Sequence, residues 1–325
     1  MTFGTNQNNI SPTRIRPRMV PIPCESTPIT PDIKASRDRM RPSVDGNPVD
    51  LAPVIRSDVA RALAEDIGSG DVTARLVPEN EAAHARVISR EAAVLCGSEW
   101  FDEVFRQIDP GTRVKWHARD GDRVSRDQVL CELDGRARGL LTGERTALNF
   151  IQTLSGVATR TRTYVDAIAG TKATILDTRK TLPGLRQALK YAVRCGGGSN
   201  HRMGLYDGIL IKENHIAAAG GIGPVLRQAG QLAGTVPIQI EVESIAQLSA
   251  AIAAGAQLIL LDNFDLAGLR EAVKVTAGRA VLEASGGVNL DTVRAIAETG
   301  VDRISVGSLT KDVRAVDLSM RFVPG

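Results

Sequence analysis

Apolar and polar positions follow two different patterns along this chain of 325 residues. Between residues 54 and 139, a helical stretch over 57–67 precedes short apolar segments that are separated by turn sequences. Closely spaced strands with intervening turns predict an antiparallel sheet with one or two helices, which is an α+β arrangement. From residue 173 onward, apolar runs of three or four residues alternate with helical segments. That alternation is typical of parallel strands joined by crossover helices.

Six apolar runs make up the second pattern, and they cover residues 173–176, 208–211, 238–240, 258–261, 281–284 and 304–306. A closed barrel of alternating strands and helices needs eight such units. We therefore predict an α/β fold, with an open, incomplete α/β barrel preceded by an α+β sandwich as the N-terminal domain.

A long helical segment connects the two patterns. Thr142 can cap its beginning, and Glu144 then lies in the first turn. Apolar residues over 148–165 recur at spacings of three and four, which predicts one buried stripe. A second, mostly polar line runs through Arg145, Asn149, Gln152 and Gly156. Such a line usually faces solvent, but on a helix covered on both sides it points into a site or across a subunit contact.

The first 50 residues have a different composition from the rest of the chain. They hold 8 of the 15 prolines. Proline removes a backbone donor and biases the preceding residue toward extended geometry, so this segment cannot sustain a helix. It also lacks the apolar core of a secretory signal. We predict that residues 1–50 form a solvated or loosely docked tail.

Composition excludes several classes of protein. A net charge of +3 and 11 aromatic residues do not provide the basic surface or the stacking platform of a nucleic-acid-binding protein. The chain lacks the run of about 18 apolar residues that a membrane span needs. The four cysteines lie far apart without a CxxC pair, at Cys24, Cys96, Cys131 and Cys195. This spacing argues against a zinc site and favours a reducing compartment, so we expect a cytoplasmic protein.

Polar or glycine residues follow all six apolar runs. They are Asp177, Thr178, Arg179 and Lys180 after the first run, Lys212 after the second, Glu241 after the third, Asp262 after the fourth, Ser285, Gly286 and Gly287 after the fifth, and Gly307 and Ser308 after the sixth. Parallel strands carry their carboxyl ends to one face, where barrel active sites are assembled. One such charge is usually a helix cap or a solvated loop residue, but six in equivalent places predict a shared site.

Basic residues outnumber acidic residues in this predicted site. The basic residues are Arg179, Lys180 and Lys212, with His201 and Arg202 added from the loop after the glycines at 196–198. The acidic residues are Glu241 and Asp262. Arginine offers a planar fork suited to carboxylate and phosphate, whereas lysine offers a point charge. The set therefore favours a polyanionic ligand, together with a cation or sugar hydroxyls next to the two acids.

Two glycine-containing loops suggest where a phosphate would bind. Residues 285–287 and 307–308 each precede a predicted helix, so their backbone N–H groups can hold a phosphate. In barrels that site commonly follows the last strands. Each loop alone is more often an ordinary turn between a strand and a helix, and the occurrence of both is what favours a phosphate site.

The segment 177–216, DTRKTLPGLRQALKYAVRCGGGSNHRMGLYDGILIKENHI, resembles the signature block of the quinolinate phosphoribosyltransferase family. The flanking pieces GERTALNFIQTLSGVATRT, IEVES, LILLDNF, EASGGV and ISVGSL fall in the expected order. The resemblance covers the chain from about residue 54 to its end. It implies that quinolinate and phosphoribosyl pyrophosphate, with Mg²⁺, give nicotinate mononucleotide, pyrophosphate and carbon dioxide in NAD biosynthesis.

The resemblance also implies a domain arrangement and an assembly. We expect a tail at 1–50, an α/β-sandwich domain at 51–155 to which residues 311–325 return, and a catalytic barrel at 156–310. Members of the family are homodimers in which each active site takes an arginine from the partner chain, and the matching position here is Arg145. Whether dimers pair further into hexamers stays open at this point.

Given this family, physical chemistry assigns roles to the predicted site residues. Arg145, Arg179, Lys180, His201 and Arg202 would neutralise the two carboxylates of quinolinate. Lys180 and Lys212, with Mg²⁺, suit the pyrophosphate. Glu241 and Asp262 would hold Mg²⁺ or the ribose hydroxyls and stabilise positive charge at C1 of the sugar. The 5′-phosphate would bind at the loops with Ser285, Gly286, Gly287, Gly307 and Ser308. We expect Lys180, Lys212, Glu241 and Asp262 to be the catalytic residues.

Three alternatives remain open at the level of sequence. A lysine at the end of a barrel strand, Lys212, could form a Schiff base in an aldolase-type lyase. A paralogue with the same fold could act on another aromatic acid, although a monocarboxylate would need fewer cations. The chain could also be a dimeric binding module without catalytic activity.

Overall fold

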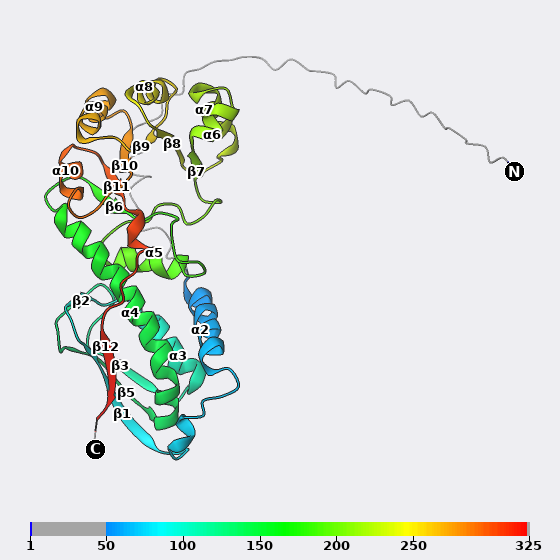
Figure 1. Ribbon diagram of the computed structural model, residues 1–325, viewed down its shortest axis with the longest axis vertical. Helices are drawn as coiled ribbons and strands as arrows, with labels where there is room; N and C mark the ends of the chain where they lie inside the picture. Colours follow the sequence, from blue (N-terminus) through cyan, green and yellow to red (C-terminus); the bar gives the residue numbers. More distant parts are fainter. Residues whose placement is uncertain (2–49, 324–325) are drawn as a thin grey trace. The chain divides into compact units, whose positions relative to one another are not determined.

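The computed structural model of the protein describes Met1 and residues 50–323. The predicted tail at 1–50 lies, apart from its two end residues, outside the described residues. The described strands form one four-stranded, one six-stranded and one two-stranded sheet (Figure 1). The two-stranded sheet consists of β2 (Ala93–Val94) and β4 (Arg123–Val124). No described helix has the length and apolar composition to cross a membrane.

The four-stranded sheet is antiparallel. Its strands, in spatial order, are β12 (Leu318–Phe322), β1 (Ala82–Ser89), β5 (Val129–Arg136) and β3 (Arg113–Trp116). In β1, Ala85 and Val87 are fully buried and Arg86 between them is exposed, which is the alternation of a sheet with one face on the core. The register pairs Ala85 with Leu133 on one side and with Phe322 on the other. The last described strand therefore joins the sheet that the N-terminal half of the chain builds.

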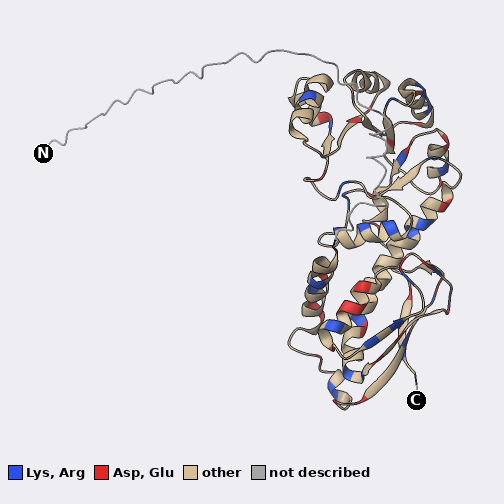
Figure 2. Cartoon of the chain, turned by 180° about the vertical axis from the view of Figure 1, so that it is seen from behind, with Lys and Arg blue, Asp and Glu red and all other residues tan. Residues whose placement is uncertain are grey.

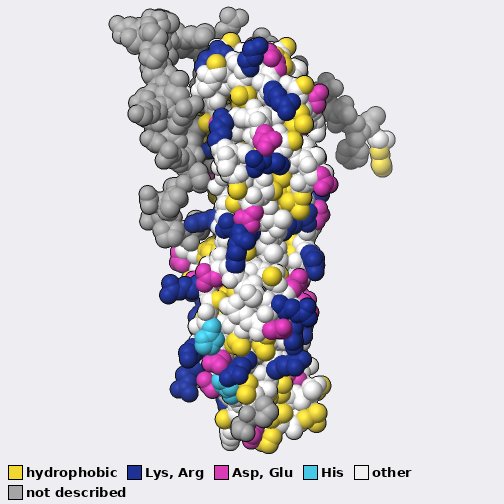
Figure 3. Space-filling model, turned by 90° about the vertical axis from the view of Figure 1, so that its left-hand side faces the viewer, with side chains coloured by type: hydrophobic (Ala, Val, Ile, Leu, Met, Phe, Trp, Pro, Cys, Tyr) yellow, Lys and Arg dark blue, Asp and Glu magenta, His cyan; other side chains and the backbone are white. Residues whose placement is uncertain are grey.

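Charged side chains occupy the outer face of this sheet. Arg86 Nε donates to Glu132 Oε1 over 3.0 Å, and His84 Nδ1 lies 2.9 Å from Asp134 Oδ1 across the same strand pair. His117 Nε2 is 3.3 Å from the second oxygen of Glu132. Figure 3 shows histidines among basic and acidic side chains on one surface of the molecule. The outer face of the sheet is thus stabilised by cross-strand pairs rather than by apolar packing.

Helix α4 (Ala137–Ala167) packs on strands of the inner face, and α2 (Ala52–Ile67) and α3 (Ser98–Ile108) pack against α4 and each other. Trp100, Phe101 and Phe105 on α3 are buried, and the ring of Phe101 meets that of Trp116 at 5.3 Å. The side chain of Asp120 caps α3 from a separate loop. A short 3₁₀ turn, η1 (Ala74–Leu76), lies between α2 and β1 in the chain.

Helix α4 begins five residues before the predicted cap. Its N-cap is Arg136, so the prediction of Thr142 as the cap is wrong. The hydroxyl of Thr142 donates instead to Asp71 Oδ2, 2.9 Å away. The predicted apolar stripe is buried, with the exception of the half-buried Val165. At Gly156 an added Cβ would lie 2.1 Å from the carbonyl oxygen of Arg314, because the C-terminal segment crosses the helix there.

The six-stranded sheet is parallel. Its strands, in spatial order, are β6 (Thr174–Leu176), β11 (Arg303–Ser305), β10 (Val281–Ser285), β9 (Leu258–Asp262), β8 (Ile238–Val242) and β7 (Ile209–Ile211). Each strand coincides with one of the six predicted apolar runs. The strands β6 and β7 follow each other in sequence but form opposite edges of the sheet. The predicted open, incomplete barrel is therefore confirmed for the described residues.

Helices connect these strands, and they are α5 (Arg186–Cys195), α6 (Glu213–Ala218), α7 (Ile222–Leu232), α8 (Ile245–Ala253), α9 (Leu266–Thr276) and α10 (Val293–Glu298). Ser244 caps α8 and Asp265 caps α9 by accepting backbone hydrogen bonds. Strand β9 is buried from Leu258 to Leu261, as expected for a central parallel strand covered on both faces. Acidic and basic residues are interspersed over the helices and strands (Figure 2), so a strongly basic site requires a local gathering of cations.

Candidate active site

The carboxyl ends of β7, β8 and β9 bring three predicted site residues together. Lys212 Nζ lies 3.2 Å from Glu241 Oε2 and 3.4 Å from Glu241 Oε1. Burial raises the pKa of the Glu241 carboxyl, the ion pair with Lys212 opposes this rise, and the negative charge of Asp262 adds to it. The parallel register also aligns Asp262 with Ser285 on β10. One cation and two carboxylates thus share the edge of the sheet.

The ends of β6 and β11 form a second part of the site. The backbone N–H of Lys180 donates to Thr178 Oγ1 over 3.0 Å. At Gly307 an added Cβ would lie 3.1 Å from Cδ of Lys180, so the two loops are in contact. Ser308 Oγ is buried and has no hydrogen-bond partner among the described residues. The site therefore combines a lysine with an unpaired hydroxyl.

The predicted helix starts at the two glycine-containing loops are wrong. Residues after β11 form the short 3₁₀ turn η2 (Gly307–Leu309), and α10 begins six residues after Gly287. The structure explains the glycine at 286 differently, because it has a φ of +103° and an added Cβ would lie 2.2 Å from Asn263 Oδ1. Asn263 in turn donates to Asp262 Oδ2 over 2.9 Å. The loop at 285–287 thus packs against the Asp262 end of β9.

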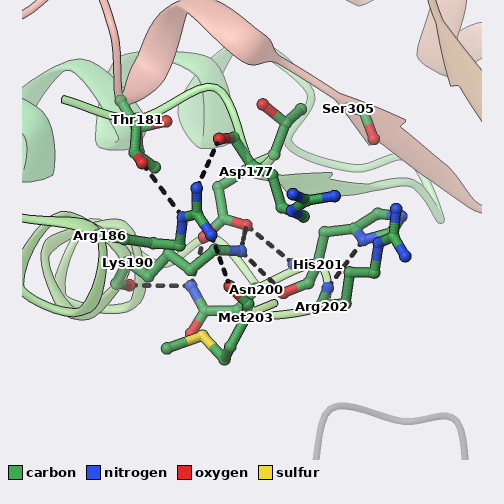
Figure 4. Close-up of polar contacts among 12 residues, drawn as sticks. Asp177, Thr181, Arg186, Lys190, Asn200, His201, Arg202, Met203 and Ser305 are labelled. Carbon is green, nitrogen blue, oxygen red and sulfur yellow. Dashed lines mark hydrogen bonds and ion pairs between the residues drawn. The ribbon is translucent and has the colours of Figure 1, made fainter. Parts of the chain in front are cut away.

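A buried aspartate organises the loop that carries His201 and Arg202 (Figure 4). Asp177 is fully buried, and its Oδ1 accepts from Lys190 Nζ at 2.5 Å and from the backbone N–H of His201 at 2.9 Å. Its Oδ2 accepts from the side chain of Asn200 at 2.5 Å. Burial raises the pKa of Asp177 and lowers that of Lys190, while their mutual ion pair opposes both shifts. Three donors to one carboxylate offset the cost of burying its charge.

Two guanidinium groups lie next to this loop. Burial lowers the pKa of Arg202, the neighbouring positive charge of Arg179 lowers it further, and the negative charge of Asp207 opposes both. Arg202 Nη1 donates to the carbonyl of Gly208 over 2.9 Å. Arg179 Nε is buried and has no partner among the described residues. Two adjacent positive charges with free N–H donors favour the binding of an anion.

The imidazole of His201 is held at both nitrogens. Its Nδ1 accepts from the backbone N–H of Arg202 at 2.7 Å, and its Nε2 lies 2.9 Å from Gln239 Oε1. Gln239 Nε2 donates to a carboxylate oxygen of Glu283, 2.9 Å away. Because that carboxylate accepts, the amide oxygen of Gln239 must face His201, and Nε2 carries the proton. The hydroxyl of Ser305 donates to the other oxygen of Glu283 and completes a buried chain. The imidazole is thus fixed in place between the loop and the sheet, and the role of His201 as a cation toward the ligand stays a prediction.

Arg145 is the predicted residue that lies away from the others. It is exposed on α4, and the neighbouring Thr146 donates to Asp66 of α2 at 3.2 Å. The remaining predicted residues lie at the carboxyl ends of strands of the six-stranded sheet, shortly after those ends, or in the loop at 200–202. Within one chain the structure therefore gathers the strand-end residues but not Arg145.

Sequence reasoning missed a layer of polar residues beneath the site. Gln239, Glu283 and Ser305 each stand inside an apolar run that we predicted to be a buried strand. A polar residue in such a run needs a partner, and that signal could have identified them. Lys190 lies among buried apolar residues on α5 and offers the same signal.

Comparison with known proteins agrees with this architecture. Residues 71–155 match the family model of the quinolinate phosphoribosyl transferase N-terminal domain, and residues 157–321 match that of the C-terminal domain. The chain is 45% identical over 257 residues to the probable nicotinate-nucleotide pyrophosphorylase [carboxylating] of Bacillus subtilis, which covers 79% of this chain and 89% of that protein. It is also 45% identical over 274 residues to the nicotinate-nucleotide pyrophosphorylase [carboxylating] of Mycobacterium leprae, which covers 82% and 96%.

Solved structures show the same fold. The nicotinate-nucleotide pyrophosphorylase from Francisella tularensis superposes with a TM-score of 0.82 and 45% identity over 83% of this chain and 96% of that one. Human nicotinic acid phosphoribosyltransferase, at 13% identity and a TM-score of 0.54, shares the fold alone. The open barrel with its cationic strand ends thus has the architecture of phosphoribosyltransferases. Within that class, the chain belongs to the quinolinate phosphoribosyl transferase family, as its sequence predicted.

Proposed function

We propose that this chain transfers the phosphoribosyl group of phosphoribosyl pyrophosphate to quinolinate, giving nicotinate mononucleotide, pyrophosphate and carbon dioxide for NAD biosynthesis. The observation that carries the proposal is the pair of neighbouring guanidiniums of Arg179 and Arg202, in which Arg179 Nε is buried without a partner among the described residues. Quinolinate supplies two adjacent carboxylates to such a pair. Each charge-assisted hydrogen bond would contribute about 1.5–3 kcal/mol before desolvation is subtracted.

The strand-end residues account for the other parts of the reaction. Lys180 and Ser308 would bind the phosphoribosyl phosphates, since a buried unpaired hydroxyl and an ammonium both donate to phosphate oxygens. Lys212 would face the departing pyrophosphate. The ring nitrogen of quinolinate attacks C1 of the sugar as pyrophosphate leaves, and Glu241 and Asp262 would stabilise the positive charge that develops there. The ribosylated nitrogen is then cationic and stabilises the carbanion left when the adjacent carboxylate departs as carbon dioxide.

The two carboxylates of Glu241 and Asp262 also fit Mg²⁺. This ion takes hard oxygen ligands, usually one or two carboxylates plus waters and substrate phosphate oxygens. Burial and, to a smaller extent, the charge of Asp262 raise the pKa of Glu241, and a divalent cation would stabilise both carboxylates in their ionised form. When bound, Mg²⁺ would neutralise charge on the leaving pyrophosphate. Among the described residues, the sole group of three His, Cys or acidic ligands lies elsewhere, so substrate oxygens would complete the coordination.

The Schiff-base alternative requires an uncharged Lys212. Its Nζ instead forms an ion pair with Glu241, 3.2 Å away, so no free amine faces a carbonyl substrate. The arginine pair would also have no role in such a lyase. The geometry therefore favours phosphoribosyl transfer.

The proposed function includes an oligomeric state and a cellular compartment. Arg145 is exposed and distant in sequence and fold from the strand-end set, so it would reach a site only from a partner subunit. We propose a homodimer in which each subunit contributes Arg145 to the other. We also propose that the enzyme works in the cytoplasm.

A direct assay tests the proposed function. Purified full-length protein is incubated with quinolinate, phosphoribosyl pyrophosphate and Mg²⁺, and carbon dioxide and nicotinate mononucleotide are measured. We expect both products in equal amounts. Nicotinate in place of quinolinate is the control, because it lacks the second carboxylate and should react poorly. Equal rates with both acids, or no product with quinolinate, would overturn the proposal.

A further inference from the structure

Two cysteines form a polar cluster outside the proposed active site. Cys96 lies between β2 and α3, and Cys195 is the last residue of α5. Their sulfur atoms and a carboxylate oxygen of Asp120 all lie within 4.8 Å of one another. Cys96 is fully buried and Cys195 is half-buried. Sequence reasoning did not identify this pair, because the two residues are far apart in the chain and belong to no recognisable motif.

The surroundings of the pair make Cys195 the more reactive thiol. The hydrogen bond with Cys96 lowers the pKa of Cys195, while burial and the negative charge of Asp120 oppose this shift. Burial raises the pKa of Cys96, so that thiol stays protonated. A partly exposed cysteine next to a second, buried thiol is the arrangement of a redox-sensitive cysteine and its resolving partner.

Asp120 is already engaged by other groups. Its Oδ2 accepts from the backbone N–H of Gly97 at 2.8 Å and from the hydroxyl of Tyr191 at 2.9 Å. Its Oδ1 accepts from the backbone N–H of Ser98. The carboxylate therefore caps α3 and orients Tyr191. This use of Asp120 favours a reaction between the two sulfurs over a metal site with three ligands.

We propose that Cys96 and Cys195 form a reversible disulfide under oxidising conditions. A peroxide is the oxidant: the Cys195 thiolate attacks one oxygen, the O–O bond breaks, and a sulfenic acid and a hydroxide or alkoxide result. The Cys96 thiol then attacks the Cys195 sulfur, the S–S bond forms, and water leaves. Rotation of the two side chains has to bring the sulfurs to about 2.05 Å. A dithiol reductant restores both thiols.

The disulfide would also reduce phosphoribosyl transfer. This second part of the inference rests on the proposed function. The residues directly after Cys195 lead through Gly196 to His201 and Arg202. At Gly196 an added Cβ would lie 2.5 Å from both the carbonyl oxygen of Ala158 and Cβ of Thr161, so this turn has no room to adjust. Pulling the end of α5 toward Cys96 would therefore displace the loop that carries Arg202. We expect the oxidised enzyme to lose most of its activity.

The test uses the full chain with Cys24→Ser, because Cys24 lies outside the described residues and should not compete. The reduced protein is treated with hydrogen peroxide, its free thiols are alkylated, and its peptides are mapped by mass spectrometry. We expect a Cys96–Cys195 linked peptide, a mass lower by two hydrogens, and reversal by dithiothreitol. The buried Cys131 serves as an internal reference that should remain a thiol. Recovery of both Cys96 and Cys195 as free thiols after peroxide treatment would overturn the disulfide. Binding of one equivalent of zinc that protects both thiols from oxidation would also overturn it.

Matched variants separate the steps. In Cys96→Ser, the sulfenic acid on Cys195 should persist and react with dimedone, whereas Cys195→Ser should give neither adduct nor crosslink. Tyr191→Phe keeps the ring that packs on Trp100 but removes a donor to Asp120, whose negative charge opposes ionisation of Cys195, so oxidation should slow several-fold. Quinolinate transfer should fall at least fivefold on oxidation of the parent, recover with dithiothreitol, and stay constant in Cys195→Ser. A crosslinked protein with unchanged turnover would overturn the effect on activity. The mass measurement is independent of whether the reduced protein transfers phosphoribosyl groups at all.

Discussion

Single residues at the strand ends differ in what they do for the reaction, and Asp262 gives the clearest case. Its carboxylate lies beside Glu241 and is fixed by Asn263. Replacing Asp262 by Asn removes a negative charge near C1 while keeping the shape. We expect kcat to fall about 100-fold with little change in the Kd for quinolinate, since preorganised charges act mainly in the transition state. Steady-state kinetics and equilibrium binding measure the two quantities.

Asp265 provides a control for that substitution. It lies three residues further on and caps α9 by accepting from the backbone N–H of Gly268. Asn caps helices about as well as Asp, so Asp265→Asn should leave kcat unchanged. An unaltered kcat in Asp262→Asn would remove Asp262 from the mechanism.

The pH dependence of turnover offers a second residue-scale prediction. Burial and the charge of Asp262 raise the pKa of Glu241, and Lys212 opposes this rise. If the ionised carboxylate is required, activity is present above that raised pKa and falls as the pH drops through it. Asp262→Asn removes one of the causes that raise the pKa, so the acid limb of its residual kcat profile should move to lower pH. An acid limb that stays in place would show that Glu241 does not control it.

Helix α5 acts as an element that positions the loop after it. Lys190 projects from its buried face to Asp177, and donates also to the carbonyl of His201 at 2.8 Å. Lys190→Met would leave the carboxylate of Asp177 buried without its ammonium. We expect a loss of about 3–5 kcal/mol in the free energy of unfolding, measured by urea denaturation. The KM for quinolinate should also rise, because Arg202 follows directly after His201.

Two further variants test this assignment. Arg194→Ala changes an exposed residue on the same helix and should alter neither quantity. The double variant Asp177→Asn with Lys190→Met removes both charges and should recover part of the lost stability. If the double variant were as unstable as the sum of the two single variants, the ion pair would not be the cause.

At the crossing of α4 and the C-terminal segment, one glycine determines the packing. Gly156→Ala would place Cβ 2.1 Å from the carbonyl oxygen of Arg314, next to the backbone hydrogen bond from Val316 to Gln152. We expect a loss of stability of about 1–3 kcal/mol, typical of overpacking, seen as a lower midpoint in thermal unfolding. Gly230→Ala in α7 is the control, because nothing lies within 4 Å of its added Cβ. That change should be neutral or stabilise by up to about 1 kcal/mol.

The elements themselves were largely predictable, for a physical reason. Parallel strands covered on both faces are mainly apolar, so the run at 258–261 identified its strand without further information. Local signals were less reliable at ends, as the early start of α4 shows. The strand-end residues were predictable because parallel topology places them on one edge. The chain from His201 through Gln239 and Glu283 was not, because side-chain partners from separate strands depend on tertiary packing.

For the whole molecule, the central question is how Arg145 reaches a site. In one chain it is exposed on α4, away from the strand-end residues. If a partner subunit supplies it, each active site uses Arg145 of one chain and Lys180 of the other. Arg145→Ala and Lys180→Ala would then each be inactive alone, while a heterodimer would contain one intact site and one site that lacks both residues. A two-fold interface makes this pairing reciprocal.

Mixing the two variants by co-expression tests that arrangement. Random pairing gives half heterodimers with one intact site each, so activity should recover to about a quarter of that of the unmodified protein. Asn149→Ala, on the same exposed line of α4, should remain active and shows whether that surface tolerates change. Purified heterodimers carrying different tags should show half the normal activity per dimer. If they show none, Arg145 and Lys180 serve the same site from one chain, and the shared site has to be abandoned.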